Sequence, residues 1–315
     1  MWGGRRFHSF DFDCRERFGT KLYKLSLDAG FSCPNRDGTL GRRGCIFCSA
    51  GGSGDFAADR ALPIRGQLDA AKALVAAKNR SGRYIAYFQA FTNTYAPPKV
   101  LRARYFEAAA EPDIAAVAIA TRPDCLPPEV LSVLAELNAF KPVTVELGLQ
   151  TVHERSARFI RRGYPLSVYD DAVHRLAESG VDIVTHLILG LPGETRADML
   201  ASVQHVCSLP LSGIKLQLLH ILRGTDLAAV YETCPGLFPL LGLSDYIDTL
   251  LDCLAVIPGN IVIHRLTGDG PKRLLIAPEW SGNKRLVLNT LEKEMKRRDF
   301  LQGEALGSDS GCPRL

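Results

Sequence analysis

The sequence predicts an α/β protein built from parallel strand–helix–strand units, arranged as an incomplete barrel or as an open sheet. Apolar runs of strand length alternate with segments whose apolar residues recur every three or four positions. No internal repeat and no long linker rich in Pro or Ser divides the 315 residues. Such alternation favours crossover connections and a parallel sheet, whose functional site lies at the carboxyl ends of the strands.

Seven runs are expected to form the strands. The first alternates apolar and polar residues, the next five are apolar or β-branched, and the last comes late in the chain. In order, they are residues 22–28, 84–91, 114–120, 143–149, 181–189, 213–221 and 260–266.

Helical segments separate these runs. They are residues 65–79, 99–110, 128–138, 167–179, 195–207, 245–256 and 286–298, with a further short helix within 153–162. The dipeptide Pro127-Pro128 is a common helix start. Ser167 and Gly180 are expected to cap the helix between them, and Thr195 is a candidate cap for the next.

Nine cysteines are too few for a disulfide scaffold and, being odd in number, cannot all pair within the chain. The first residues lack the apolar run of a signal peptide, and no apolar stretch is long enough to span a membrane. We therefore expect a reducing, cytoplasmic compartment, in which clustered thiols indicate a metal site or catalysis. A formal net charge of +4 is compatible with a polyanionic partner but does not require one.

Three cysteines follow the first expected strand. Eleven residues separate Cys33 from Cys45, and two separate Cys45 from Cys48. The loop is rich in Gly, Asn and Asp, so its backbone can wrap an inorganic core and direct N–H groups at sulfur. Three thiolates would leave one iron of a [4Fe–4S] cluster without a protein ligand. From the spacing alone, two alternatives stay open: a zinc site completed by Cys14, Cys125 or a histidine, and three buried thiols without a shared role.

Residues 30–48 resemble the cluster loop of the radical S-adenosylmethionine (SAM) superfamily, and the longer stretch 24–55 is similar to an uncharacterised bacterial group within it. The eleven residues between Cys33 and Cys45 depart from the three-residue gap that is commonest in the superfamily. Variant gaps occur in this group and in the elongator-type branch. The resemblance implies a partial (β/α)6 barrel similar to a TIM barrel, with a C-terminal extension. It also implies a [4Fe–4S] cluster on Cys33, Cys45 and Cys48 whose open iron binds SAM, so that reduction of SAM gives a 5′-deoxyadenosyl radical.

Further motifs resemble the catalytic subunit of the elongator complex, between about residues 20 and 230. That subunit has a histidine before a Leu-Pro turn, a lysine at the start of strand six and an Arg-Gly-Thr after it; here these are His186, Lys215 and residues 223–225. The resemblance implies catalytic roles for His186 and Lys215. We expect no acetyltransferase-like domain, because too little chain follows residue 230. Residues 190–195 (GLPGET) resemble a turn of the oxygen-independent coproporphyrinogen oxidases that lies beside the SAM adenine.

The superfamily resemblance also places polar residues around SAM. In place of the usual Gly-rich turn after the second strand stand Gln89, Thr92 and Asn93, which can exchange hydrogen bonds with the SAM amino group. Glu146 lies inside an apolar run and is expected to bind the ribose hydroxyls. The structural alternative is a polar strand end or turn for the first three residues, and a surface position or an ion pair for Glu146. The other residues expected to bind SAM are Thr121, Gln150, His186 and, for the SAM carboxylate, Arg158.

The chain is expected to contain four regions. They are an N-terminal segment (1–20), a radical SAM core (21–230), an extension that closes the barrel (231–302) and a flexible tail (303–315). In the extension, His264, Arg265 and Asp269 are candidates for lining the open side of the barrel, and helix 286–298 for covering its exposed edge.

Three functions are compatible with these residues. The first is a tRNA-modifying enzyme acting at C5 of a wobble uridine and served by a flavodoxin- or ferredoxin-like electron donor; it rests on the elongator resemblance and on basic clusters such as Arg158, Arg161 and Arg162. The second is an enzyme acting on a small metabolite such as a porphyrin precursor, suggested by residues 190–195. The third is a non-catalytic, zinc-stabilised RNA-binding protein.

Overall fold

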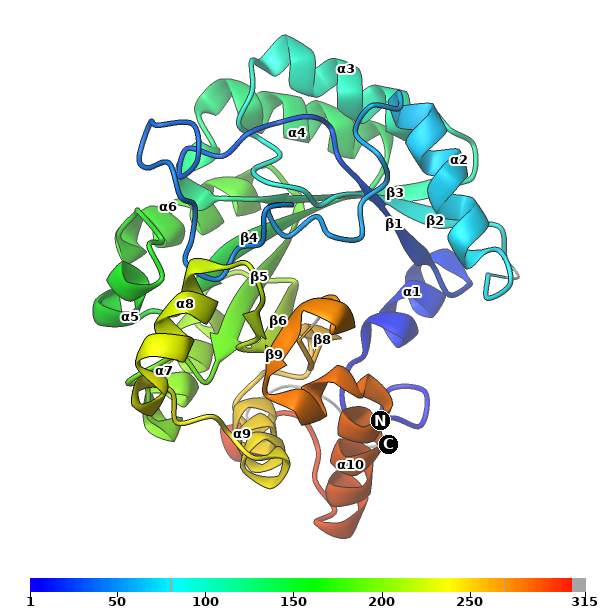
Figure 1. Ribbon diagram of the computed structural model, residues 1–315. Helices are drawn as coiled ribbons and strands as arrows, with labels where there is room; N and C mark the ends of the chain where they lie inside the picture. Colours follow the sequence, from blue (N-terminus) through cyan, green and yellow to red (C-terminus); the bar gives the residue numbers. More distant parts are fainter. Residues whose placement is uncertain (80, 269, 308–315) are drawn as a thin grey trace.

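Seven parallel strands curl into a half barrel in this computed structural model, which describes residues 1–79, 81–268 and 270–307 (Figure 1). The strands neighbour one another in chain order, which confirms the α/β barrel prediction and excludes an open doubly wound sheet. They are β1 (Tyr23–Leu27), β2 (Tyr84–Phe88), β3 (Ile114–Thr121), β4 (Val143–Gln150), β5 (Asp182–Leu189), β6 (Gly213–Leu218) and β8 (Val262–Arg265).

Helices cover the outer face of the sheet, and each expected helix is present. They are α2 (Ile64–Val75), α3 (Pro98–Ala109), α4 (Pro128–Phe140), α5 (Glu154–Phe159), α6 (Leu166–Glu178), α7 (Arg196–Cys207), α9 (Leu243–Ala255) and α10 (Lys284–Arg297). Thr195 caps α7 in a reciprocal capping box with Asp198, as expected. Ser167 is not a cap, because α6 begins at Leu166 directly after Pro165 and Ser167 falls inside its first turn. Within the described residues, no helix is long and apolar enough to cross a membrane.

Two expected strands end earlier than their apolar runs. The strand expected over residues 84–91 stops at Phe88, since Phe91 adopts a left-handed φ of 60° that a strand cannot continue. The run 213–221 divides into β6 and a separate strand β7 (Ile221–Leu222). Strand β7 pairs antiparallel with β9 (Leu275–Ala277) to form a two-stranded sheet, followed by α8 (Asp226–Thr233).

The N-terminal segment contains a helix, α1 (Phe10–Phe18), that the sequence did not suggest. Ser9 accepts a hydrogen bond from the Phe12 N–H at the start of α1 and also forms a parallel bridge with Ile263 of β8. Cys14 is buried against a small apolar cluster formed by the inner residues of β2 and β3. Helix α1 therefore fills the open side of the half barrel between its two edge strands.

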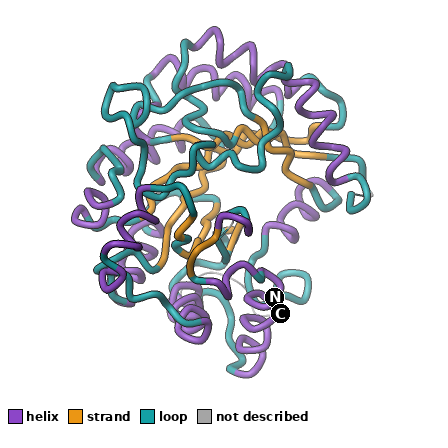
Figure 2. The backbone as a smooth tube through the Cα atoms, in the orientation of Figure 1, coloured by secondary structure: helices purple, strands orange, loops and turns teal. Residues whose placement is uncertain are grey.

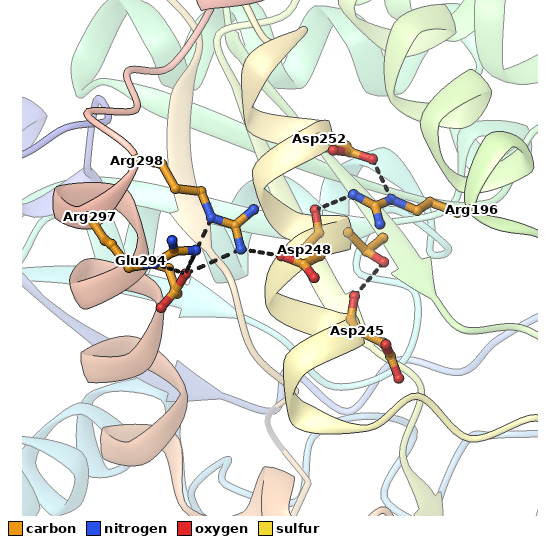
Figure 3. A network of polar contacts seen from close by, with 8 residues as sticks. Arg196, Asp245, Asp248, Asp252, Glu294, Arg297 and Arg298 are labelled. Carbon is orange, nitrogen blue, oxygen red and sulfur yellow. Dashed lines mark hydrogen bonds and ion pairs between the residues drawn. The ribbon is translucent and has the colours of Figure 1, made fainter.

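The C-terminal helices are tied to one another by ion pairs on the surface, as Figure 3 shows. Arg298, directly after α10, pairs with Asp248 of α9 at 2.5 Å and with Glu294 of α10. Arg196 of α7 pairs with Asp252, so α9 is held from both sides. Because these groups are partly exposed, each pair is worth about 0–1 kcal/mol.

The two terminal segments meet (Figure 2). The His8 N–H donates to Gln302 Oε1 at 2.8 Å, the Gln302 N–H donates to the Arg6 carbonyl at 3.0 Å, and Arg6 pairs with Asp299 at 2.8 Å. The expected tail begins with a short 3₁₀ turn, Glu304–Leu306, and its residues 308–315 lie outside the described residues.

Candidate functional site

A cavity of about 240 Å³ lies at the carboxyl ends of the strands, where a parallel barrel places its functional site. Strands β2 to β6 and β8 all contribute side chains to its wall, and the loop between β1 and α2 forms the remaining side. Of the twelve residues expected to hold the cluster, bind SAM or act in catalysis, nine line it: Cys33, Cys45, Cys48, Gln89, Thr92, Thr121, Glu146, Gln150 and His186.

The cysteine loop is organised by two polar side chains. Asn35 Nδ2 donates to Cys45 Sγ at 3.4 Å and to the Arg161 carbonyl at 2.8 Å, which fixes the loop to α5. The Arg36 guanidinium donates to the Ser49 carbonyl at 2.6 Å. A Cβ at Gly44, whose φ is 75°, would lie 2.9 Å from Arg36 Nε, so this position requires glycine.

The environment of the thiols favours thiolate formation at Cys45. A hydrogen bond from Cys48, together with Arg122 and Asn35, lowers the pKa of Cys45 to about 6 against the effect of burial. The same hydrogen bond and burial raise the pKa of Cys48. Because thiolates are the metal-binding form of cysteine, a positive ion or cluster would reinforce this tendency.

The three thiols match the ligand set of a [4Fe–4S] cluster. All three are free cysteines and line the same cavity. Such a cluster takes three cysteine ligands on three irons and keeps the fourth iron open. In the part of the chain that the structure describes, no group of three His, Cys, Asp or Glu side chains that could hold a single metal ion is found.

Glu146 forms the floor of the cavity, and its side chain is fully buried. Its carboxylate accepts from Lys24 Nζ and Lys215 Nζ, each at 2.5 Å, from Tyr87 Oη at 2.6 Å and from His186 Nε2 at 2.9 Å. Burial alone would raise the pKa of Glu146, but Lys215 and Lys24 hold it well below its usual range. The sequence alternative of an ion pair therefore describes Glu146, and its oxygens already have four protein donors.

His186 is held as a neutral imidazole at this floor. Burial, with the charge of Lys215 adding to it, lowers the pKa of His186 to about 4. The Glu146 carboxylate can only accept a hydrogen bond, so His186 Nε2 carries the proton and Nδ1 keeps a lone pair. His186 lines the cavity, and its Nδ1 can accept a hydrogen bond from a bound molecule.

Three residues singled out from the sequence do not line the cavity. Lys215 lies beneath it, buried against Glu146 and Tyr87. Asn93 is buried and donates to the Phe88 and Ala120 carbonyls, so it joins β2 to β3. Arg158 is exposed on α5 and is not brought to the cavity.

Arg162, four residues after Arg158, is the arginine of this segment that turns inward. Only 1% of it is exposed, and it donates to the carbonyls of Thr151 and Tyr164 at 2.6 and 2.9 Å. It lines the cavity, as does Arg122 after β3. Arg122 forms a two-pronged ion pair with Asp124, at 2.7 and 2.9 Å.

The end of β4 is distorted where it meets the cavity. Gln150 has a left-handed φ of 68°, and the pairing of β4 with β5 shifts register between Gly148 and Gln150. A Cβ at Gly148 would lie 2.7 Å from the end of the Gln150 side-chain amide, so glycine lets this side chain fold back. Strain of this kind is characteristic of ligand-binding positions.

Sequence reasoning missed Tyr87 and Lys24. Tyr87 lies two residues before Gln89, so the alternation of β2 places both side chains on the inner face. Lys24 occupies the corresponding face of β1.

The candidates of the C-terminal extension have different outcomes. Arg265 lines the cavity, His264 stacks on Phe10 at 4.4 Å, and Asp269 lies outside the described residues. None of residues 190–195, all of them described, lines the cavity.

Comparison with known proteins defines the class. Residues 38–206 match the Radical SAM superfamily, and residues 211–297 match the Radical SAM C-terminal domain. The chain therefore belongs to the Radical SAM superfamily, whose members are enzymes that use a [4Fe–4S] cluster and SAM. This confirms the expected family and cofactors and gives no support to the zinc-stabilised RNA-binding alternative.

Three similar proteins show which members of the family this chain resembles in sequence or fold. The chain is 46% identical to the uncharacterized protein YtqA of Bacillus subtilis, over 95% of this chain and 92% of YtqA. It is 27% identical to Elongator complex protein 3 of Schizosaccharomyces pombe over 59% of this chain, which spans 34% of that protein. The solved archaeal Elp3 of Methanocaldococcus infernus shares the fold, with a TM-score of 0.66 and 15% identity, over 93% of this chain and 68% of Elp3.

Proposed function

We propose that this enzyme forms a 5′-deoxyadenosyl radical from SAM and uses it to modify C5 of a wobble uridine in tRNA, in the cytoplasm. The observation that carries the proposal is a three-thiol cavity with a polar floor. The fold around this cavity matches that of the archaeal Elp3 over 93% of this chain. Modification of a base requires an exposed or flipped nucleotide, which an anticodon loop provides.

In this proposal Cys33, Cys45 and Cys48 hold the cluster. When bound, the cluster supplies the electron that cleaves the SAM sulfonium, and Radical SAM enzymes draw that electron from a donor, here a flavodoxin- or ferredoxin-like protein. Asn35 and Arg36 keep the thiol loop in place. The half barrel surrounds the reacting groups and limits the access of water to them.

The polar residues at the strand ends would bind SAM. Gln89, Thr92, Thr121 and Gln150 line the same cavity as the thiols, so they could bind the polar groups of the cofactor. A bond from Glu146 to the ribose hydroxyls would require Glu146 to give up one of its four protein donors. Arg122 and Arg162 are better placed than Arg158 to face the SAM carboxylate.

His186 is the proposed acid–base residue. With Nε2–H donated to Glu146, its Nδ1 can accept a proton from a bound substrate. Lys215 does not reach the cavity, so we assign it a positioning role: it keeps Glu146 ionised, and Glu146 keeps the His186 tautomer fixed. Residues 231–302 would complete the core by supplying β8, which extends the sheet beside β6.

Two measurements test the proposal. After anaerobic reconstitution, the protein should contain about four irons per chain and should form 5′-deoxyadenosine from SAM with dithionite. Nucleosides from tRNA of a deletion strain, analysed by mass spectrometry, should lack one C5-substituted uridine. Absence of 5′-deoxyadenosine would overturn the radical chemistry. Unchanged tRNA nucleosides, with SAM cleavage intact, would overturn the RNA substrate and direct the search to a small metabolite.

A further inference from the structure

Exposed cations without acidic partners stand beside the cavity. Arg42 lies two residues before Gly44, Arg223 directly follows Leu222, and Lys272 and Arg273 follow Gly270 by two and three residues. Gly44, Leu222 and Gly270 all line the cavity. Over the described ranges, none of these four cations forms an ion pair. We call this group the rim cations.

Many cations elsewhere on the surface are paired. Arg102 pairs with Glu136 at 2.5 Å, Arg175 with Asp171 at 2.7 Å and Lys296 with Glu292 at 3.2 Å. Arg196, Arg297 and Arg298 are likewise paired. Other exposed cations, such as Lys99, Arg155 and Lys293, form no ion pair with any described residue, so the rim cations are distinguished by their place beside the cavity.

The rim cations come from two neighbouring segments beside the cavity. Arg42 belongs to the cysteine loop, next to Arg43, and Arg43 and Arg161 share a single carboxylate, that of Asp226. Arg223 lies three residues before Asp226, and its backbone N–H donates to the Leu274 carbonyl at 2.7 Å. That bond sets Arg223 beside Arg273 at the end of the β7–β9 sheet. The two segments meet where the Leu227 N–H donates to the Ile46 carbonyl at 2.9 Å, so the rim cations lie along one edge of the cavity.

We propose that the rim cations bind the phosphates of an RNA strand whose target base enters the cavity. The inference rests on the proposed function and adds the surface that recognises the substrate. Exposed arginines and lysines without carboxylate partners suit phosphate, and a single strand offers phosphates on both sides of an extruded base. A strand whose base enters the cavity must place its flanking phosphates beside that cavity, where the rim cations lie, so this arrangement favours RNA over an acidic electron-donor protein.

The test compares two triple variants of the full-length reconstituted enzyme. The rim variant carries Arg42→Gln, Arg223→Gln and Arg273→Gln. The control carries Arg5→Gln, Lys78→Gln and Lys293→Gln, which removes the same charge from exposed positions remote from the cavity lining. Binding of unmodified tRNA is measured by anisotropy between 50 and 300 mM salt. Thermal melting verifies the fold, and Arg223→Gln alone serves if the triple variant is unstable.

The rim variant should bind tRNA at least tenfold more weakly, and the slope of log K against log salt should fall by about 2 to 3, because each lost phosphate contact removes about 0.7 to 0.9. The control should change affinity less than twofold. Formation of 5′-deoxyadenosine with dithionite should stay unchanged in both.

Equal losses in the two variants, or no loss in the rim variant, would overturn the inference. A rim variant that binds tRNA normally but loses SAM cleavage only when flavodoxin replaces dithionite would assign the surface to the electron donor and also overturn it. Failure of the proposed function is distinct: wild-type enzyme would then bind tRNA through the rim while nucleosides of the deletion strain stay unchanged.

Discussion

The two faces of β4 carry different kinds of residues. The outward side chains are apolar, no more than 1% exposed, and packed under the helices, whereas the inward side chains are mostly polar and line the cavity or approach it. The outward residues are Val143, Val145, Leu147 and Leu149, and the inward residues are Thr144, Glu146, Gly148 and Gln150. Because strand side chains alternate, one strand supplies both barrel stability and site chemistry, and neighbouring substitutions should affect different properties.

The largest effect is expected at the thiols that face the inner side of β4. Cys45→Ala should reduce iron content and lower 5′-deoxyadenosine formation more than about 100-fold, because a cluster with two protein ligands is not retained. Cys234→Ala, at an exposed free cysteine, is the matched control and should leave both properties unchanged. Wild-type rates in Cys45→Ala would remove these thiols from the chemistry.

Among substitutions on the inner face, Glu146→Ala should lower the stability of the protein most. It leaves Lys24 and Lys215 without their shared carboxylate in a buried site, which typically destabilises a protein by about 3–5 kcal/mol. Urea unfolding of the apoprotein measures this change. Adding Lys215→Met should recover part of the loss, since the buried cation is removed as well. A Glu146→Ala protein as stable as wild type would show that the floor is hydrated rather than closed.

Leu147→Ala, one residue along the strand, should destabilise by about 2–5 kcal/mol through the cavity it leaves in the outer core. Its effect on chemistry should be small, since Leu147 does not line the site. At 10 °C, where the variant stays folded, SAM cleavage should lie within about threefold of wild type. A specific loss of activity in folded Leu147→Ala would contradict the division between the two faces.

The smallest expected effect is on the pH dependence of stability. His186 and His220 have their pKa values lowered to about 4, chiefly by burial, and the unfolded values are about 6.5. Between these pH values the unfolded chain binds protons that the folded chain does not, so stability decreases as the pH falls from 6.5 to 4. Each histidine contributes up to about 1.4 kcal/mol per pH unit. His186→Gln should flatten the urea-unfolding profile, and His174→Gln, at an exposed histidine, should not.

The barrel and the cysteine loop could be predicted because their patterns are local. Each strand carries its own periodicity, and three thiols within sixteen residues identify the loop without knowledge of the rest of the chain. The floor could not be predicted in the same way. Lys24, Tyr87, Glu146 and Lys215 come from four different strands, and their side chains meet only because the sheet curls around its inner face.

The other differences between the prediction and the structure come from the orientation of helices and from short elements. Arg158 and Arg162 are both candidates in sequence, but only the packing of α5 decides which of them turns inward. Strand β7 has two residues and exists only because β9, more than fifty residues later, pairs with it. Helix α1 was missed although Phe10, Cys14 and Phe18 recur every four residues, because most of its other residues are charged.

The contacts between the two terminal segments have a consequence for synthesis on the ribosome. The N-terminal residues emerge first, yet His8 and Arg6 bond to residues 299–302 and Ser9 to β8. Strands β1 to β6 can pair in order as they appear, since each neighbours its predecessor. Docking of the N-terminal segment must wait until almost the whole chain has been made, so sealing of the barrel is among the last events in its maturation.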